Sequence, residues 1–128
     1  MENFTVEKKD KYTLVKSHVE KLDSRVSPDL KSNLVLVNGN GERNIIIDLS
    51  ESRYCDSSGL SALLIANRLC RDAQGTLVLT GLQDSVSKLV SISQLDSVLN
   101  ITPTLDEAVQ FVYKDEVGRE TGEDDQPA

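Results

Sequence analysis

Short apolar runs along the chain alternate between strand-like and helix-like spacing. Residues 4–11 and 12–19 carry β-branched and aromatic side chains, which predicts a hairpin or two neighbouring strands. The runs at 44–49 and 76–82 are rich in consecutive apolar residues, with three isoleucines in a row in the first. Because a strand covered on one face alternates apolar and polar residues, these two runs predict strands that are buried on both faces.

Helical spacing separates these strands. Ser27-Pro28 is predicted to open the first helix, with the serine as N-cap, and Asn38–Gly41 to end it. Gln74-Gly75 ends the second helix, and a short extended piece at 100–104 leads to the last, where Thr104 and Glu107 have the spacing of a capping box. The apolar positions of the four helices are Leu30, Leu34 and Val37; Leu60, Leu63, Leu64, Ala66 and Leu69; Val86, Leu89, Val90 and Ile92; and Leu105, Ala108, Val109 and Val112.

This succession of elements predicts an α/β fold: a single domain with a mixed, mostly parallel β-sheet and about four α-helices. With so few helices, part of the sheet is expected to be covered on one face only. We place the domain at residues 1–117. Residues 118–128 hold four acidic side chains and one arginine, and they are expected to form an acidic, flexible tail.

Composition narrows the function mainly by exclusion. The 128 residues include 21 acidic and 14 basic side chains, and this net charge of −7 argues against direct binding of nucleic acid or an anionic membrane. The N-terminus carries charges where a secretion signal needs apolar residues, and no apolar run could span a bilayer, so a cytoplasmic protein is expected. Cys55 and Cys70 are then expected to be reduced thiols that pack as small hydrophobes.

The stretch RYCDSSGLSALL, Arg53–Leu64, gathers small polar residues where a strand gives way to a helix. In a βα unit the helix N-terminus lies at the carboxyl edge of the sheet, where α/β proteins place their sites. We expect Ser57 to be the N-cap, with its Oγ beside unpaired N–H groups, and Gly59 to keep the turn free of a Cβ. The positive end of the helix favours negative charge at this point.

Three functions are open for this junction. Plain capping is the simplest. Nucleophilic catalysis needs a base, but the one histidine, His18, is distant in the sequence, and the chain has no Gly-x-Ser-x-Gly elbow, P-loop, Gly-x-Gly-x-x-Gly or metal-ligand spacing, so neither an enzyme nor a cofactor is expected. A modifiable hydroxyl is the third: a phosphoryl group on Ser57 would add about −1.5 to −2 charges beside Asp56 and repel a docked partner.

The segment NIIIDLSESRYCDSSGLSALL, residues 44–64, resembles the signature of STAS domains, especially that of the bacterial anti-sigma-factor antagonists. In that family a β-branched strand ends in Asp-Leu-Ser, a short loop follows, and Asp-Ser-Ser-Gly-Leu opens a helix. The resemblance extends more weakly from Val19 to Val112 and agrees in length and element order.

The resemblance implies a partner-switching regulator of transcription. In the family the unmodified antagonist binds a serine-kinase anti-sigma factor and frees the sigma factor; the kinase phosphorylates the antagonist, and a metal-dependent serine phosphatase resets it. The resemblance makes Ser57 the phosphorylation site, with Ser58 as the second choice. It assigns Asp23, Asp48, Asp56, Ser58, Gly59 and Leu60 to the acceptor loop and partner-binding edge. Asp23 and Asp48 are expected either to shape this loop or to be solvated or capping carboxylates.

Three positions depart from the family pattern. Glu20 and Ser61 stand where many relatives have glycine, and Ser52 occupies a usually apolar loop position. None removes the acceptor, but Glu20 and Ser61 lie near the expected docking edge and bear on which partner binds. Two alternatives to switching stay open: a constitutive STAS scaffold of a signalling or transport complex, and a domain that binds a small anion or nucleotide at the same helix N-terminus.

Overall fold

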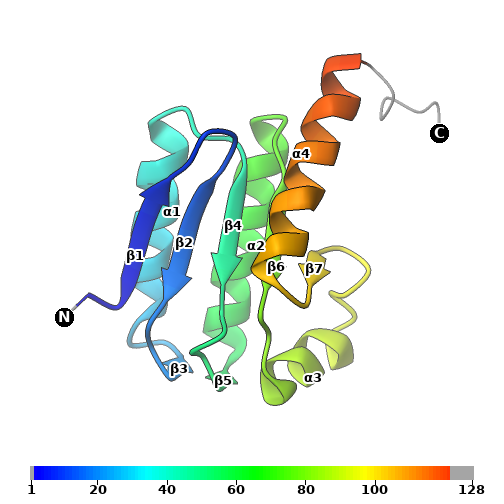
Figure 1. Ribbon diagram of the computed structural model, residues 1–128. Coiled ribbons are helices and arrows are strands. Elements are labelled where there is room, and N and C mark those ends of the chain that lie inside the picture. The colour runs from blue at the N-terminus through cyan, green and yellow to red at the C-terminus, as the bar shows by residue number, and fades with distance from the viewer. Residues whose placement is uncertain (1, 122–128) are drawn as a thin grey trace.

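Strands and helices alternate in the computed structural model, which describes residues 2–121 (Figure 1). In chain order the elements are β1 (Phe4–Lys8), β2 (Thr13–Ser17), β3 (Lys21–Leu22), α1 (Ser27–Gly39), β4 (Ile45–Asp48), β5 (Tyr54–Cys55), α2 (Ser57–Asp72), β6 (Leu77–Thr80), α3 (Asp84–Ile92), β7 (Asn100–Thr102) and α4 (Leu105–Thr121).

The main sheet has the strand order β1-β2-β4-β6-β7. β1 is antiparallel to β2, and the other neighbours in this sheet are parallel. The two remaining strands, β3 and β5, pair with each other in a short parallel ladder beyond the carboxyl ends of β2 and β4 (Figure 1). The mixed, mostly parallel sheet and the four helices confirm the predicted α/β fold, including the hairpin at the start of the chain.

The isoleucine run in β4 lies at the centre of the sheet. Ile45, Ile46 and Ile47 are all fully buried. Ile45 and Ile47 belong to the larger core with residues of α1, α2 and α3, whereas Ile46 packs with Ala108 and Val112 of α4. The strand is therefore buried on both faces, as its unbroken apolar sequence predicts.

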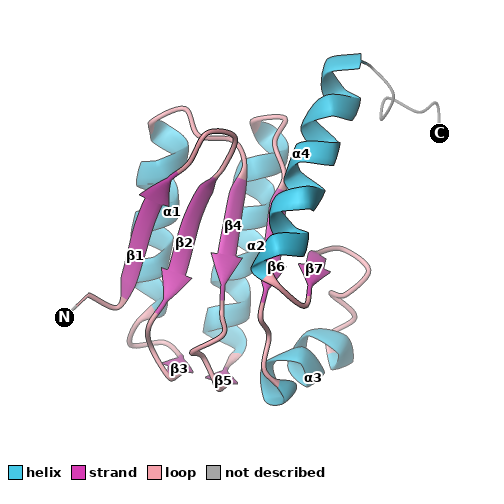
Figure 2. Ribbon diagram, in the orientation of Figure 1, coloured by secondary structure: helices cyan, strands magenta, loops and turns pink. Residues whose placement is uncertain are grey.

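The two faces of the sheet are covered unequally. α1 and α2 lie side by side on one face, and α4 lies on the other, against β4, β6 and β7 (Figure 2). Within the described residues, the α4 face of β1 and the outer part of β2 has no helix over it. This confirms that part of the sheet is covered on one face only.

The start of α1 differs from the prediction. Val26, rather than Ser27, is the N-cap, and Ser27 is the first helical residue. The backbone of Val26 already has right-handed helical dihedral angles, and the Ser27 hydroxyl donates a hydrogen bond to the carbonyl oxygen of Asp23 at 2.7 Å. The serine therefore bonds backwards to the preceding turn instead of capping the helix.

The later helices follow the pattern more closely. Thr104 Oγ1 accepts a hydrogen bond from the N–H of Glu107 at 3.2 Å, which is one of the two bonds of the predicted capping box. Ile92 is instead 79% exposed at the last residue of α3 and adds nothing to its buried face. α4 continues to Thr121, so residues 118–121 of the segment assigned to the tail are helical, while 122–128 lie outside the described residues.

A buried carboxylate joins the second half of α4 to the sheet. Glu116, only 5% exposed, accepts hydrogen bonds from Asn44 at 2.9 Å, Arg43 at 3.0 Å and Arg119 at 2.6 Å. Burial by itself raises the pKa of Glu116, but the hydrogen bonds from Asn44 and Arg43 outweigh it and the pKa is lowered. Because Asn44 and Glu116 are 72 residues apart, no local pattern indicates this contact.

The turn after α2 is packed too tightly for a side chain at Gly75. A Cβ built there would lie 1.8 Å from the carbonyl oxygen of Arg43. We expect Gly75→Ala to lower the free energy of unfolding by about 1–3 kcal/mol, because the backbone must move to relieve the overlap. Gly39→Ala is the control, since nothing lies within 4 Å of its added Cβ. Urea denaturation checks both, and equal midpoints for the two variants would contradict the prediction.

Candidate functional site at the N-terminus of α2

Asp56 is the N-cap of α2. Its backbone is extended, and its Oδ1 accepts hydrogen bonds from the N–H groups of Ser58 at 2.9 Å and Gly59 at 3.1 Å. The prediction that Ser57 caps the helix was wrong: Ser57 is the first helical residue. The side chain before it already satisfies two unpaired N–H groups of the first turn, as an N-cap carboxylate does.

The two adjacent serines differ in environment. The Ser58 hydroxyl is half-buried and donates a hydrogen bond to Asp56 Oδ1 at 2.6 Å. Ser57 is exposed, and its hydroxyl has no hydrogen-bond partner among residues 2–121. A serine hydroxyl carries one hydrogen, so that of Ser58 is committed to Asp56 and that of Ser57 is free.

Asp56 carries a stable negative charge beside Ser57. The pKa of its carboxyl is lowered, chiefly because the Ser58 hydroxyl donates to it, and further because the N–H groups of Gly59, Ser58 and Ser24 do. Partial desolvation acts in the opposite direction without reversing the shift. The carboxylate is therefore ionised at neutral pH.

The loop between β3 and α1 is hydrogen-bonded to this turn. Asp23 accepts two hydrogen bonds from the Arg25 guanidinium, the shorter at 3.0 Å, and these bonds lower the pKa of Asp23. The negative charge of Asp56 acts in the opposite direction and raises the pKa, but the net shift is downward. The Oγ of Ser27, which is 1% exposed, lies 3.3 Å from Ser58 Oγ. The structure thus brings Asp23 and Asp56 to one edge. Ser27 was not predicted to belong to this site, because its place before a proline and an apolar run resembles an ordinary helix cap.

Gly59 and Leu60 fix the helix against the domain. A Cβ on Gly59 would lie 2.4 Å from the carbonyl oxygen of Leu22 and 2.8 Å from Cys55 Sγ. Leu60 is 8% exposed and packs in the main core. Of the residues assigned to the partner-binding edge, these two hold α2 in place rather than offer a surface.

Asp48 lies at the same edge of the sheet but in a different loop. Its Oδ1 accepts the N–H of Ser50 at 2.9 Å, so it stabilises the turn after β4. An open hollow of about 440 Å³ is lined by Arg53, by Gln83 and by Asp84 and Ser85 at the start of α3, and the Ser85 hydroxyl donates to the Arg53 carbonyl. This hollow was not predicted, because its walls come from segments that are distant in the sequence.

The three departures from the family pattern have separate explanations. Ser52 is fully buried, donates to the carbonyl of Val19 at 2.8 Å and lies 2.8 Å from the hydroxyl of Ser17. The polar residue is thus satisfied where an apolar one is usual. Glu20 and Ser61 are both exposed, and Glu20 forms an ion pair with Arg53 at 3.9 Å.

The histidine and the two cysteines have structural surroundings. The two ring nitrogens of His18 face Thr5 at 2.9 Å and Glu51 at 3.3 Å. Cys55 and Cys70 are free and buried, and burial raises their pKa values to about 11 and about 12, so both thiols are protonated core residues. Within residues 2–121, no three His, Cys, Asp or Glu side chains gather to hold a metal ion, and no helix is long and apolar enough to cross a membrane.

The chain matches a known protein family. The family model of the STAS domain matches residues 3–108. The chain belongs to the STAS domain family. This STAS domain is 30% identical over 104 residues to the anti-sigma-B factor antagonist of Listeria monocytogenes, a match that covers 77% of this chain and 89% of that protein.

Solved structures of anti-sigma factor antagonists share the fold. One from Mycobacterium paratuberculosis has a TM-score of 0.78 at 23% identity and covers 86% of this chain and 92% of its own. Unphosphorylated SpoIIAA has a TM-score of 0.68 at 18% identity, covering 86% and 97%. The phosphorylated form of SpoIIAA from Bacillus has a TM-score of 0.67 at 20% identity, covering 85% and 98%.

Two substitutions of Asp56 distinguish its role as a hydrogen-bond acceptor in the cap of α2 from the effect of its charge. We expect Asp56→Ala to lower the free energy of unfolding by about 1 kcal/mol, because two N–H groups of the first turn lose their acceptor. Asp56→Asn keeps an acceptor and is expected to cost less. Urea denaturation at pH 7 compares the variants, and an Asp56→Ala protein as stable as wild type would contradict the cap.

The same carboxylate predicts a pH dependence. Because the folded-state pKa of Asp56 is lowered, its charge adds stability above the unfolded-state pKa of about 4, and this contribution is lost as the pH falls through the lower folded-state value. The difference in stability between wild type and Asp56→Asn should therefore shrink as the pH falls below about 4. Denaturation series over pH 7 to 2.5 measure it; a constant difference would contradict the assignment.

Proposed function

We propose that this STAS domain is a partner-switching anti-sigma factor antagonist. It binds a serine-kinase anti-sigma factor when Ser57 is unmodified, and phosphorylation of Ser57 by that kinase releases it. A serine phosphatase then restores the unmodified form. The relative from Listeria monocytogenes named as an anti-sigma-B factor antagonist, and the existence of SpoIIAA in phosphorylated and unphosphorylated forms, support the role.

The observation that carries the proposal is the difference between the two serines. A kinase needs a hydroxyl that reaches its active site and gives up its proton to a base of the kinase. Ser57 is exposed and its hydroxyl is free, whereas the hydroxyl hydrogen of Ser58 is held by Asp56 at 2.6 Å. Ser57 is therefore the preferred acceptor, and Ser58 positions the cap.

The transfer reaction requires no chemistry from this chain beyond the acceptor oxygen. Ser57 Oγ attacks the γ-phosphorus of ATP on the kinase, the bond from that phosphorus to the β–γ bridging oxygen breaks, and ADP leaves. The hydroxyl proton passes to the kinase. Hydrolysis by the phosphatase returns the serine hydroxyl and inorganic phosphate.

Electrostatics explains why the modification would release a partner. Phosphoserine brings about −1.5 to −2 charges to an edge where Asp23 and Asp56 are already ionised. The first turn of α2 can hold the new charge without unfolding, since helix N-termini favour anions. A partner surface that fits the neutral serine would then face repulsion and a desolvation penalty.

The acceptor assignment is tested with the cognate serine kinase and ATP, with the modified residue located by mass spectrometry. Wild type and Ser58→Ala are expected to gain one phosphoryl group, and Ser57→Ala none. Circular dichroism verifies that the variants fold. Phosphorylation of Ser57→Ala to the wild-type extent would remove Ser57 from the proposal.

Release is tested by titrating the kinase with Ser57→Asp, in which a negative charge replaces the hydroxyl. We expect its affinity to fall by about tenfold or more, equivalent to about 1.4 kcal/mol. Gln110→Glu, which adds the same charge on exposed α4 at the other face of the sheet, is the control and should bind as wild type does. Equal affinity of Ser57→Asp and wild type would contradict the switch.

A further inference from the structure

An exposed arginine, Arg25, lies in the loop that is hydrogen-bonded to the N-terminus of α2. Its Nη2 and Nε both donate to Oδ2 of Asp23, at 3.0 and 3.3 Å, and its backbone N–H donates to Oδ1 of the same carboxylate at 3.0 Å. The side chain of Arg25 is nevertheless 79% exposed, whereas that of Asp23 is 15% exposed. The guanidinium is therefore held on one side only and is open to solvent on the other.

Two contacts join the surroundings of Arg25 to the turn that carries Ser57. The N–H of Ser24 donates to Asp56, the residue before Ser57. The Oγ of Ser27, at the start of α1, lies 3.3 Å from the Oγ of Ser58, the residue after Ser57. The contacts on either side of Arg25 thus involve the residues on either side of Ser57, and a long side chain at Arg25 can reach a group attached to Ser57.

A phosphoryl group on Ser57 needs hydrogen-bond donors that the first turn of α2 has already used. The N–H groups of Ser58 and Gly59 donate to Asp56 Oδ1 at 2.9 and 3.1 Å, and the Ser58 hydroxyl donates to the same oxygen at 2.6 Å. These three donors stay with Asp56 as long as it caps the helix. Because the charge of Asp56 also repels a second anion, a positively charged donor from outside the helix is needed to pair with the phosphate.

We propose that phosphorylation of Ser57 moves the Arg25 guanidinium from Asp23 to the phosphoserine. This inference rests on the proposed function, because it requires a phosphoserine at position 57. A guanidinium forms paired hydrogen bonds with a phosphate, whose charge of about −1.5 to −2 attracts it more strongly than the single charge of a carboxylate does. An exposed ion pair such as that of Arg25 with Asp23 contributes little stability, so its loss opposes the exchange only weakly.

The exchange alters the partner-binding edge at two further points. In the unmodified protein Arg25 presents an exposed positive charge beside the neutral Ser57. After modification this charge is engaged by the phosphate, and Asp23 is left without its guanidinium partner. Asp23 keeps the backbone N–H of Arg25, so the loop need not refold. A partner that contacts Arg25 through an acidic group would lose that contact in the same event that introduces the phosphate.

Two other positive side chains at this edge provide matched controls. Arg53 forms an ion pair with Glu20 at 3.9 Å and lines the hollow at the start of α3. Lys21 is exposed on β3. Replacing either residue by alanine changes the net charge by the same amount as Arg25→Ala does, and leaves the pair of Arg25 with Asp23 in place.

The second pKa of the phosphoserine, which is about 6 without a partner, measures the contact. The probe is the full chain with phosphoserine incorporated at position 57 during translation, titrated by ³¹P NMR from pH 4 to 8. Because a bonded guanidinium favours the dianion, Arg25→Ala should raise this pKa by about one pH unit relative to the phosphorylated wild type. Arg25→Lys keeps the charge but not the paired hydrogen bonds, and should give a value between the two.

The controls decide whether the effect is specific to Arg25. Lys21→Ala and Arg53→Ala should raise the pKa clearly less than Arg25→Ala does, and circular dichroism verifies that all variants fold. Equal pKa values for the phosphorylated wild type and Arg25→Ala would overturn the proposal, as would a rise with either control as large as that with Arg25→Ala.

The titration separates this proposal from the proposed function, because it uses no kinase. If the kinase modifies Ser57 but Arg25→Ala leaves the pKa unchanged, the role of Arg25 is removed and the switch stands. If the kinase does not modify Ser57 but the pKa rises as expected, the acceptor assignment is removed and the contact of Arg25 with a phosphate at this position stands.

Discussion

The site depends on the close approach of the first turn of α2 to β3. Gly59 lies so near the carbonyl oxygen of Leu22 that no side chain fits between them, and Leu60 anchors the same turn in the core. This contact sets the direction in which the helix leaves the sheet. It thereby decides that Ser58 faces the domain and Ser57 faces solvent.

A single carboxylate then gives two neighbouring serines different chemistry. Asp56 caps the helix and takes the hydroxyl hydrogen of Ser58, so its negative charge is held beside the free hydroxyl of Ser57. Asp23 adds a second charge from the β3–α1 loop, and the N–H of Ser24 in that loop donates to Asp56. These contacts join the two loops into one edge.

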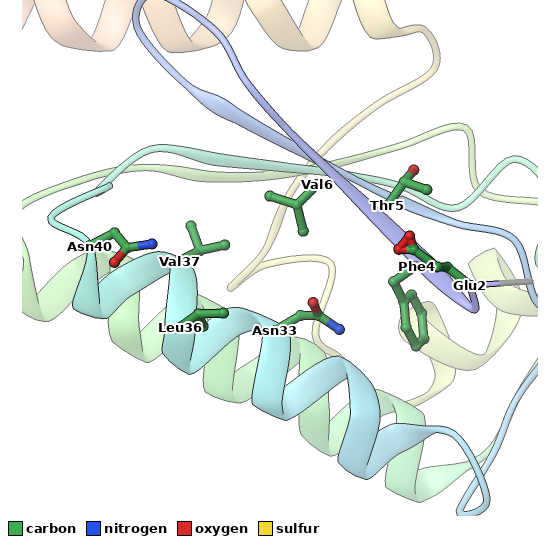
Figure 3. A pocket seen from close by; sticks show the side chains of 8 residues that line it. All are labelled: Glu2, Phe4, Thr5, Val6, Asn33, Leu36, Val37 and Asn40. Atoms are coloured by element: carbon green, nitrogen blue, oxygen red, sulfur yellow. The ribbon is translucent and has the colours of Figure 1, made fainter.

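The helices that cover the sheet leave this edge open. α1 and α2 cover one face of the sheet and α4 covers part of the other, so the carboxyl ends of the parallel strands are left for a site. The buried Glu116 of α4 is hydrogen-bonded to Asn44, the residue just before β4, and this contact ties α4 to the sheet. β1 remains an open strand with an apolar groove beneath it (Figure 3).

The longer elements could be predicted from sequence patterns because their causes are local, whereas the two-residue strands β3 and β5 were not predicted. The three isoleucines of β4, the Thr104 cap and the Asp-Ser-Ser-Gly-Leu junction each act within a few residues, and the fold and the candidate site could be predicted from them. What only the tertiary structure decided involves partners distant in the chain: Ser27 beside Ser58, Ser52 beside Ser17, and Glu116 beside Asn44. Ser27 and Ser57 were both expected to cap, because a serine before an apolar run has the same sequence signature whether its hydroxyl caps, bonds backwards or faces solvent. Only the packing of the loops around each serine distinguishes these outcomes.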